Sequence, residues 1–433
     1  MKAIISNKIY MTVEPSLHRQ LERELTYKIP DYNSQEQFVL IKNLKVINYN
    51  INGNLLVAIP VGRTDLIPKG YEIVDKRATN YIENFPKFLG TLRPSQQAIC
   101  DDLSDNCMIN APVGFGKTYS ALAIAAKLKQ KTLVLVHTVA LRNQWEKEIK
   151  DVLGIKAGVI GSGRFNIDSP IVVANVQSLS KYVVNLAKEF GLLITDECHH
   201  ISAPTFTKII DGLFCRYKIG LSGTLERKDQ KHVVFKDYFG HKIYKPEKEN
   251  TMTPSVHIVL SGLEFPDGSA AWANRVTGLC ESYLYQNLIA NLADNYAAKG
   301  HKVLVVADRV EFLTKCSELS TMESDTLTGS LDEQARERLI KSVYNDETDI
   351  VYATQSLVSE GISINPLSCL ILATPLNNMP LLEQLIGRVI RGYEGKLSPV
   401  IVDIRLEGHT VARQSSNRLS HYIKEGYEVK YIK

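Results

Sequence analysis

The chain has 433 residues, of which 44% are hydrophobic and 23% are charged, with a formal net charge of +4 at pH 7. This balance excludes a disordered chain, and the length predicts two or three domains. The seven cysteines are an odd number without a C-x-x-C pair, so we expect buried, reduced thiols and neither a disulfide framework nor a zinc site. The N-terminus lacks the apolar run of a signal peptide, and no stretch approaches the roughly 18 apolar residues that span a membrane, so we expect a cytoplasmic protein.

Residues 1–88 have the pattern of a small α+β domain. Alternating runs such as QFVLIKNLKVINYN and NLLVAIPVG predict strands, and Pro15-Ser16 marks the start of a helix in SLHRQLERELTYKI. The segment is only slightly basic and contains no catalytic pattern. We therefore expect an accessory domain.

Two stretches of apolar strands alternating with helix-length segments follow, a pattern typical of a parallel sheet covered on both faces. The expected strands of the first stretch are 132–137, 170–175, 192–196 and 218–223. Those of the second are 302–308, 349–353, 369–374 and 399–403. The polar segment 241–255 contains two prolines and predicts a linker, so the expected domains are 1–88, 89–245 and 246–433.

The stretch NAPVGFGKT, residues 110–118, joins a short apolar strand to a helix-forming segment. Its two glycines let the backbone amides turn toward phosphate oxygens, and the helix N-terminus adds a positive dipole end. Lys117 is expected to neutralise β- and γ-phosphates, and the Thr118 hydroxyl to bind Mg²⁺. The general pattern has a glycine where this chain has Ala111, and the alternative is an ordinary glycine-rich turn. The expected nucleotide-binding residues of the loop are Pro112, Val113, Gly114, Phe115, Gly116, Lys117 and Thr118.

Two adjacent acids follow the apolar strand in GLLITDECHH. Carboxylates at the carboxyl end of a strand lie at the crevice where open α/β sheets bind ligands. Asp196 is expected to hold Mg²⁺, and Glu197 to take a proton from an attacking water. Two acids alone could merely mark a strand exit, but together with the phosphate loop they predict ATP hydrolysis.

A third pattern, PLLEQLIGRVIRG, spans residues 380–392 and predicts a helix that begins after Pro380 and ends at Gly392. Gln384, Arg388 and Arg391 are spaced by four and three residues, so we expect them on one helical face with catalytic roles. Two arginines can stabilise the charge on a transferring phosphoryl group. A solvated basic face is the alternative.

The order APVGFGKT, DECH, SGT, QLIGRVIR resembles the superfamily 2 DExH helicases and translocases, whose loop pattern A-x-x-G-x-G-K-[ST] includes the alanine. The resemblance covers about residue 90 to the C-terminus and implies two tandem RecA-like domains that use ATP and Mg²⁺. LRPSQ implies that Gln96 reads adenine. The resemblance also implies residues that couple the ATP site to the nucleic acid: His199, Ser222, Thr224 and Gly361.

Other segments resemble the strand-contacting motifs of this family, with Asn175 and the G of S-G-T as departures from it. The expected contacts to the nucleic-acid backbone are Thr138, Arg142, Gln177, Arg309, Thr354 and Gln355. Hydroxyl, amide and guanidinium groups suit such contacts. Each residue could instead be a surface or capping residue. Trp145 favours core packing over base stacking, because buried aromatic residues on helices mostly pack.

The segment LSGTLERKD resembles the XPB-like and phage UvsW-like branch of the family. That resemblance implies 3′→5′ movement on DNA and unwinding or branch migration of forked or junction DNA, in replication, recombination or repair. We expect a monomer, in the host cytoplasm if phage-encoded, whose N-terminal domain engages DNA. A translocase that does not separate strands and an RNA helicase are alternatives. An ATP-switched scaffold is an alternative of another class, disfavoured by the candidate base and arginines.

Overall fold

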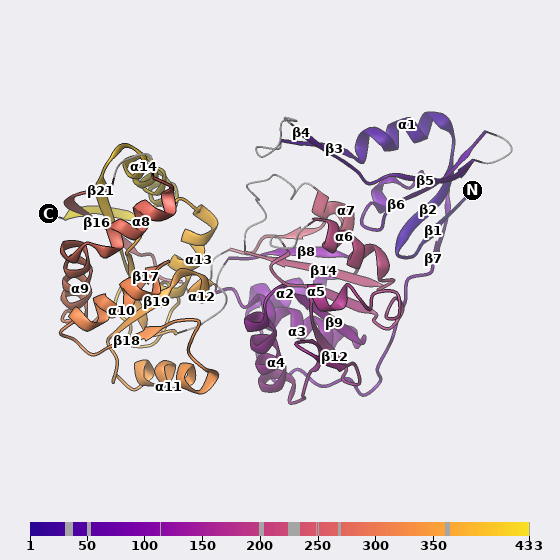
Figure 1. The fold of residues 1–433 in the computed structure, drawn as a ribbon. Coiled ribbons are helices and arrows are strands. Elements are labelled where there is room, and N and C mark those ends of the chain that lie inside the picture. The colour runs from indigo at the N-terminus through magenta and orange to yellow at the C-terminus, as the bar shows by residue number, and fades with distance from the viewer. Residues whose placement is uncertain are drawn as a thin grey trace. The chain divides into compact units, whose positions relative to one another are not determined.

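The computed structural model describes residues 1–30, 38–49, 53–112, 114–198, 203–223, 234–247, 249, 251–266, 270–359 and 364–432. It divides into two compact units, Met1–Glu247 and Lys248–Lys433, which are described separately (Figure 1). The division falls inside the predicted linker 241–255. The first residues of that segment form β15 (Ile243–Tyr244), which pairs with β8 (Cys107–Asn110) in the first unit.

The N-terminal region forms a sheet whose described strands run in the order β5-β6-β2-β1-β7. The strands are β1 (Lys2–Ile5), β2 (Lys8–Val13), β5 (Lys45–Tyr49), β6 (Leu55–Pro60) and β7 (Glu72–Asp75). The predicted helix α1 (Pro15–Glu24) begins at its proline and ends early. The residues that follow form β3 (Thr26–Pro30), which pairs with β4 (Phe38–Lys42) in a separate hairpin.

The second sheet of the first unit is parallel except at one edge, where β10 (Gly158–Gly161) and β11 (Arg164–Asn166) pair antiparallel. In the described residues the strand order is β11-β10-β12-β9-β13-β14-β8-β15. The predicted strands are confirmed as β9 (Thr132–Val136), β12 (Ile171–Asn175), β13 (Leu192–Thr195) and β14 (Tyr217–Ser222). The helices are α2 (Pro94–Asp102), α3 (Lys117–Leu128), α4 (Val139–Leu153), α5 (Val176–Leu179), α6 (Ala203–Gly212) and α7 (Phe235–Phe239).

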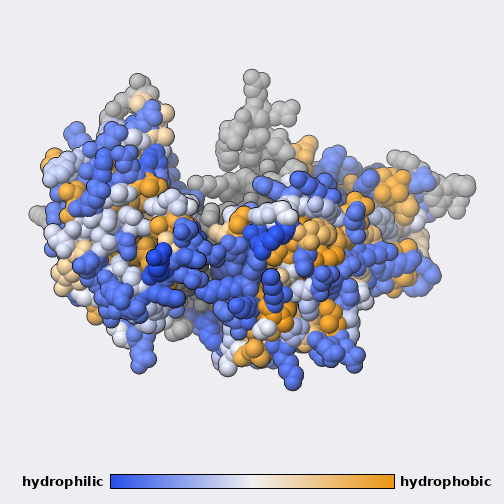
Figure 2. Space-filling view, turned by 60° about the horizontal axis from the view of Figure 1, so that its bottom comes forward, coloured by the Kyte–Doolittle hydropathy of each residue, from blue (hydrophilic) through white to orange (hydrophobic). Residues whose placement is uncertain are grey.

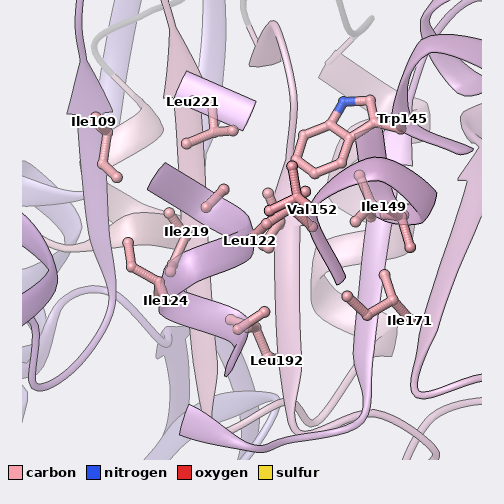
Figure 3. Close-up of a cluster of buried hydrophobic side chains, with 14 of the residues drawn as sticks. Ile109, Leu122, Ile124, Trp145, Ile149, Val152, Ile171, Leu192, Ile219 and Leu221 are labelled. Atoms are coloured by element: carbon pink, nitrogen blue, oxygen red, sulfur yellow. The ribbon is translucent and has the colours of Figure 1, made fainter. Parts of the chain in front are cut away.

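Two apolar clusters hold this sheet between its helices. One contains residues of α3 and α4 packed on the strands, among them Leu122, Trp145 and Ile149 (Figure 3). The other includes Leu133 and Leu193, whose neighbours along their strands belong to the first cluster. Successive strand residues therefore face opposite cores, which explains the continuous apolar runs of the sequence.

The second unit contains a fully parallel sheet, with the described strands in the order β18-β19-β17-β20-β21-β16-β22. Its strands are β16 (Ser255–Glu264), β17 (Lys302–Ala307), β18 (Ser324–Leu327), β19 (Ile350–Thr354), β20 (Leu367–Leu372), β21 (Val400–Glu407) and β22 (Glu428–Ile432). Its helices are α8 (Trp272–Glu281), α9 (Tyr283–Ala297), α10 (Val310–Leu319), α11 (Glu333–Tyr344), α12 (Gln355–Ser359), α13 (Met379–Val389) and α14 (His409–Lys424). β17, β19, β20 and β21 are the predicted strands.

The N-terminal region is attached to the parallel sheet of the first unit through a buried carboxylate. Asp237 on α7 is fully buried and accepts hydrogen bonds from the Tyr27 hydroxyl (2.8 Å), the Asn43 amide (2.7 Å) and the Arg63 guanidinium (3.2 Å). All three donors come from the N-terminal region. A buried carboxylate requires such partners, so the contact fixes the two parts of the first unit to each other.

Polar residues predominate on the face of the molecule in Figure 2, with hydrophobic residues in smaller patches. All seven cysteines are buried, and none of these described residues is in a disulfide, as the sequence predicts. Among the helices in the described ranges, none has the length and apolar character needed to cross a membrane.

Candidate nucleotide site and strand contacts

The phosphate-loop sequence forms the connection between β8 and α3. Gly114 and Gly116 have φ values of +88° and +82°, in the left-handed region that favours glycine. A Cβ atom on Gly116 would lie 2.8 Å from Nε2 of Gln96. The loop therefore depends on glycine at position 116 for both its backbone conformation and its close approach to α2.

Ala111 does not occupy a position that requires glycine. It is not among the residues with positive φ, its side chain is fully buried in the apolar cluster of the sheet, and its amide donates to the Ser222 carbonyl at 3.0 Å. The methyl group adds apolar contact without backbone strain. Ala111 is thus compatible with an intact phosphate loop, and its amide ties the loop to the end of β14.

The start of α2 supports the phosphate loop from one side. The Gln96 amide donates to the Phe115 carbonyl at 2.7 Å and accepts from the Arg93 backbone at 2.9 Å. The Arg93 guanidinium also donates to the Phe115 carbonyl and lies 5.4 Å from the centroid of the Phe115 ring. Gln96 therefore holds the loop in this structure, and its adenine contact stays a prediction. Arg93 is a further residue that supports the loop, and its place inside LRPSQ is the sequence signal that could have indicated it.

The candidate acids lie at the carboxyl end of β13, with one strand between β13 and the loop strand β8. Asp196 is 6% exposed and accepts hydrogen bonds from the Glu197 amide at 2.9 Å and the Trp145 indole at 2.8 Å. Burial and the neighbouring Glu197 carboxylate raise the pKa of Asp196, while Trp145 and the Lys117 ammonium oppose that rise. Lys117 of the phosphate loop is thus one of the charges that favour the ionised form of Asp196.

Glu197 has a φ of +44°, which is uncommon for a residue other than glycine. A backbone held in this region costs about 1 kcal/mol or more, and such strain concentrates at functional sites. The strained position follows directly after a buried carboxylate at the sheet edge. It supports a functional assignment for Glu197.

Trp145 is completely buried in the apolar cluster, so the core-packing interpretation is confirmed and base stacking is excluded (Figure 3). Its hydrogen bond to Asp196 is an additional feature that the sequence did not reveal. The two residues are 51 positions apart, and no local pattern connects them.

The residues at this edge of the sheet fit a magnesium nucleotide. The Asn110 and Thr195 side-chain oxygens are shielded from solvent and have no hydrogen-bond partner among the described residues. The Lys117 ammonium donates to the Ala111 carbonyl at 3.2 Å. An ammonium, a hydroxyl on Thr118 and a buried carboxylate are the groups that hold a nucleotide with its hard cation.

Some of the remaining predicted residues of the loop and the coupling set are described by the structure, and the others are not. Pro112 and Thr118 are partly exposed in the loop and on α3, and Ser222 is buried at the end of β14. Val113, His199, Thr224 and Gly361 lie outside the described residues.

The second unit contains α13, which carries Gln384 and the buried Arg388 four residues later on the same face. The prediction that Arg391 continues this helical face is wrong, because α13 ends at Val389. The Met252 amide binds the Ile390 carbonyl at 2.7 Å, and Arg391 forms a β-bridge with Thr251. Pairing with this earlier segment redirects the backbone.

Arg391 is instead held by a lysine that follows it. The Lys396 ammonium donates to the carbonyls of Arg391 (2.8 Å) and Asn365 (3.0 Å). Burial and the Arg391 charge lower the pKa of Lys396 to about 8. The position of Arg391 therefore depends on contacts distant in sequence rather than on helical spacing.

The predicted strand contacts of the first unit differ in what they present to solvent. Thr138 is the N-cap of α4 and accepts from the Leu141 amide at 3.1 Å, while Gln177 on α5 is exposed. The Arg142 guanidinium is 3% exposed and binds Asn175 (2.9 Å) and Glu146 (3.2 Å). The structure revises the prediction for Arg142, because a guanidinium buried against these partners supports α4 rather than facing a strand.

In the second unit the three predicted strand contacts lie at the carboxyl ends of neighbouring strands. Arg309 follows β17 and pairs with Asp308 at 2.9 Å, and its side chain also reaches Thr277 on α8. Thr354 ends β19 and is 9% exposed, and the Gln355 amide binds the Thr374 hydroxyl at 3.0 Å. β17 and β19 are adjacent, so these residues share one edge of the sheet.

Comparison with known proteins identifies the architecture. The family model "Type III restriction enzyme, res subunit" matches residues 88–227, and "Helicase conserved C-terminal domain" matches residues 284–393. The Escherichia phage T5 protein described as "Probable helicase D10" is 40% identical over 440 aligned positions, which cover 99% of this chain and 95% of that protein. The chain belongs to the superfamily 2 helicases.

A further relative agrees with this helicase assignment, and a solved structure agrees with the fold. The protein named "ATP-dependent DNA helicase uvsW" of Enterobacteria phage T4 is 25% identical over 351 positions, covering 75% of this chain and 70% of that protein. The structure of S. cerevisiae Dbp5 bound to RNA and ADP BeF3 has a TM-score of 0.57 at 14% identity, covering 82% of this chain and 96% of that one. The latter supports the fold alone. Together with the family match, the sheets identify two RecA-like domains behind a small N-terminal domain, in an ATP-dependent helicase.

Proposed function

We propose that this helicase uses ATP and Mg²⁺ to move along DNA and to unwind or branch-migrate forked and junction DNA. The observation that carries the catalytic part is that the phosphate loop after β8 and the acids after β13 lie at the same edge of one parallel sheet, where the Ala111 amide ties the loop to β14 between them. The printed name of the phage T4 relative and the segment LSGTLERKD support DNA as the track. We further propose a monomeric, cytoplasmic protein that acts in DNA replication, recombination or repair.

The first unit would bind the nucleotide through its loop amides and Lys117. Asp196 and Thr118 would hold Mg²⁺, which neutralises charge on the phosphate oxygens when bound. Glu197 would accept the proton of the attacking water. Glu197 follows Asp196 directly but has a different backbone conformation, with a φ of +44°, which is consistent with separate roles for the two acids.

Arg388 and Arg391 of the second unit would stabilise negative charge on the transferring phosphoryl group, with Gln384 on the same face of α13 as Arg388. The two arginines are positioned differently, one by the helix and one by the Thr251 bridge and Lys396. The contribution of Arg388 would therefore depend on α13, and that of Arg391 on the contacts with Thr251 and Lys396.

Movement requires contacts to the strand from both units. Thr138 and Gln177 in the first unit, and Arg309, Thr354 and Gln355 in the second, offer hydroxyl, amide and guanidinium groups at the strand and helix ends. Such groups bind the phosphodiester backbone without reading bases. ATP binding and hydrolysis would then change in turn which of the two sets of residues binds the strand more tightly.

Two other functions make different predictions. RNA could be the track, since the Dbp5 structure in the comparison is bound to RNA, and backbone contacts alone do not distinguish the two polymers. A pure ATP switch would bind nucleotide without turnover. Such a switch has no need of a catalytic base, so the strained Glu197 argues against it.

The test is an unwinding panel of a DNA fork, a four-way DNA junction, a tailed DNA duplex and an RNA duplex, with tails of both polarities. We expect ATP-dependent activity on the fork and junction, with 3′→5′ polarity. Lys117→Ala and Glu197→Gln should each abolish strand-stimulated hydrolysis, and Glu197→Gln should still bind ATP. Preference for the RNA duplex would refute the DNA assignment, and retained turnover in Glu197→Gln would refute the assigned base.

A further inference from the structure

The indole of Trp145 connects a strand-contacting helix to the nucleotide site. Its Nε1 donates to Oδ2 of Asp196 at 2.8 Å, while the other oxygen of that carboxylate accepts from the Glu197 amide at 2.9 Å. Trp145 is 0% exposed and Asp196 is 6% exposed, so solvent does not compete with this contact. The two hydrogen bonds fix the plane of the carboxylate.

Trp145 belongs to α4, the helix that begins at the predicted strand contact Thr138. The Thr138 hydroxyl caps α4 by accepting from the Leu141 amide. Trp145 lies seven residues after Thr138, which corresponds to two helical turns or about 10 Å along the helix axis. The buried side chains of Trp145, Ile149 and Val152 pack this helix on the sheet, so Thr138 and Trp145 belong to one continuous, anchored helix (Figure 3).

We propose that Trp145 is a positioning residue, which orients Asp196 toward the magnesium nucleotide and transmits strand binding at Thr138 through α4 to that carboxylate. Packing alone would not require a polar contact, because a phenyl ring would fill most of the same space. The inference rests on the proposed function in two respects, namely that Asp196 holds the nucleotide-bound Mg²⁺ and that Thr138 contacts the strand. Partners of metal-binding side chains typically contribute 10- to 100-fold to metal affinity or activity.

The substitution that tests this is Trp145→Phe, which removes the N–H donor and keeps an aromatic ring. The matched control is Ile149→Val, because Ile149 lies one turn further along α4, is also 0% exposed and has no polar group. Thermal unfolding of both variants measures the packing loss. Binding of a fluorescent ADP, titrated with Mg²⁺, measures the orientation of Asp196 without turnover.

We expect Trp145→Phe to need about tenfold more Mg²⁺ for half-maximal ADP binding, whereas Ile149→Val stays within twofold of the parent. Stimulation of ATP hydrolysis by single-stranded DNA should fall at least fivefold in Trp145→Phe and remain unchanged in Ile149→Val. Equal Mg²⁺ dependence in the two variants would overturn the proposal. If Asp196→Asn also left the Mg²⁺ dependence unchanged, the assignment of Asp196 itself would fail, so the two failures can be distinguished.

Fluorescence gives a second readout that does not depend on the folding of Trp145→Phe. The chain has two tryptophans, and the other is Trp272 on α8 of the second unit. In a Trp272→Phe background, the remaining emission comes from Trp145. It should change when ADP and Mg²⁺ are added together and much less with ADP and EDTA. An emission that is the same under both conditions would contradict contact between Trp145 and the metal-binding carboxylate.

Discussion

Substitution of Gly116 by alanine tests the geometry of the phosphate loop. The backbone φ of +82° costs a residue with a Cβ about 1–2 kcal/mol, and that Cβ would lie 2.8 Å from Nε2 of Gln96. The amide must then move and lose its 2.7 Å hydrogen bond to the Phe115 carbonyl, at about 1 kcal/mol more. The sum of about 2–3 kcal/mol corresponds to a 30- to 150-fold loss of ATP affinity if nucleotide binding requires the observed loop.

The control for this substitution is Gly70→Ala. Gly70 has a φ of +92°, and an added Cβ would meet no atom within 4 Å among those described. It carries the same backbone penalty without the contact and lies in the N-terminal region. Equilibrium binding of a fluorescent ATP analogue, with thermal unfolding in parallel, separates the two effects. ATP affinity of Gly116→Ala within threefold of the parent would refute the dependence of binding on this loop conformation.

Three further substitutions test other parts of the structure. Burial lowers the pKa of Lys218 to about 8 from 10.5, so its charge destabilises the first unit below pH 8, and this penalty disappears as the pH rises to 10.5. Lys218→Met should therefore raise the unfolding free energy by up to about 3 kcal/mol at pH 7 and by much less at pH 10. An equal gain at both pH values, measured by urea unfolding, would contradict this. The Arg418 guanidinium binds the Asp403 carboxylate at 2.6 and 2.8 Å, and Asp403→Asn removes this buried counter-charge. The free energy of unfolding of the second unit, measured in urea, should fall by about 3–5 kcal/mol. A decrease below about 1 kcal/mol would refute the importance of the pair. Arg142→Met should lower the unfolding temperature and leave the salt dependence of DNA binding unchanged, whereas a slope reduced by about one phosphate contact would restore Arg142 as a strand contact.

The central strands of both parallel sheets were predictable because they are buried on both faces. The continuous apolar run LLIT indicates a buried strand without reference to the rest of the chain, and β13 (Leu192–Thr195) differs from the predicted range 192–196 by one residue. The N-terminal strands β1 and β2 were missed, since MKAIISNKIYMTVEP mixes apolar and polar residues over short lengths. Their pairing partners β6 and β7 come much later in the chain.

The candidate site shows the same division between local and distant contacts. The phosphate loop is a local motif whose two glycines were expected to let the backbone turn, and Gly114 and Gly116 have the left-handed φ values that allow such a turn. Arg391 leaves the predicted helical face because Thr251 and Met252 bind its segment from outside the motif. The contact between Trp145 and Asp196 joins two motifs that are distant in the sequence, so the residue spacing within either motif cannot predict it.

The most direct test of an ATP-driven DNA motor is the rate of ATP hydrolysis with and without forked DNA, compared between the parent and Glu197→Gln at saturating ATP. We expect DNA to stimulate the parent at least tenfold and to leave Glu197→Gln without measurable turnover, although both bind ATP and DNA. ATP binding without hydrolysis in the parent, with or without DNA, would contradict the account and favour a nucleotide switch.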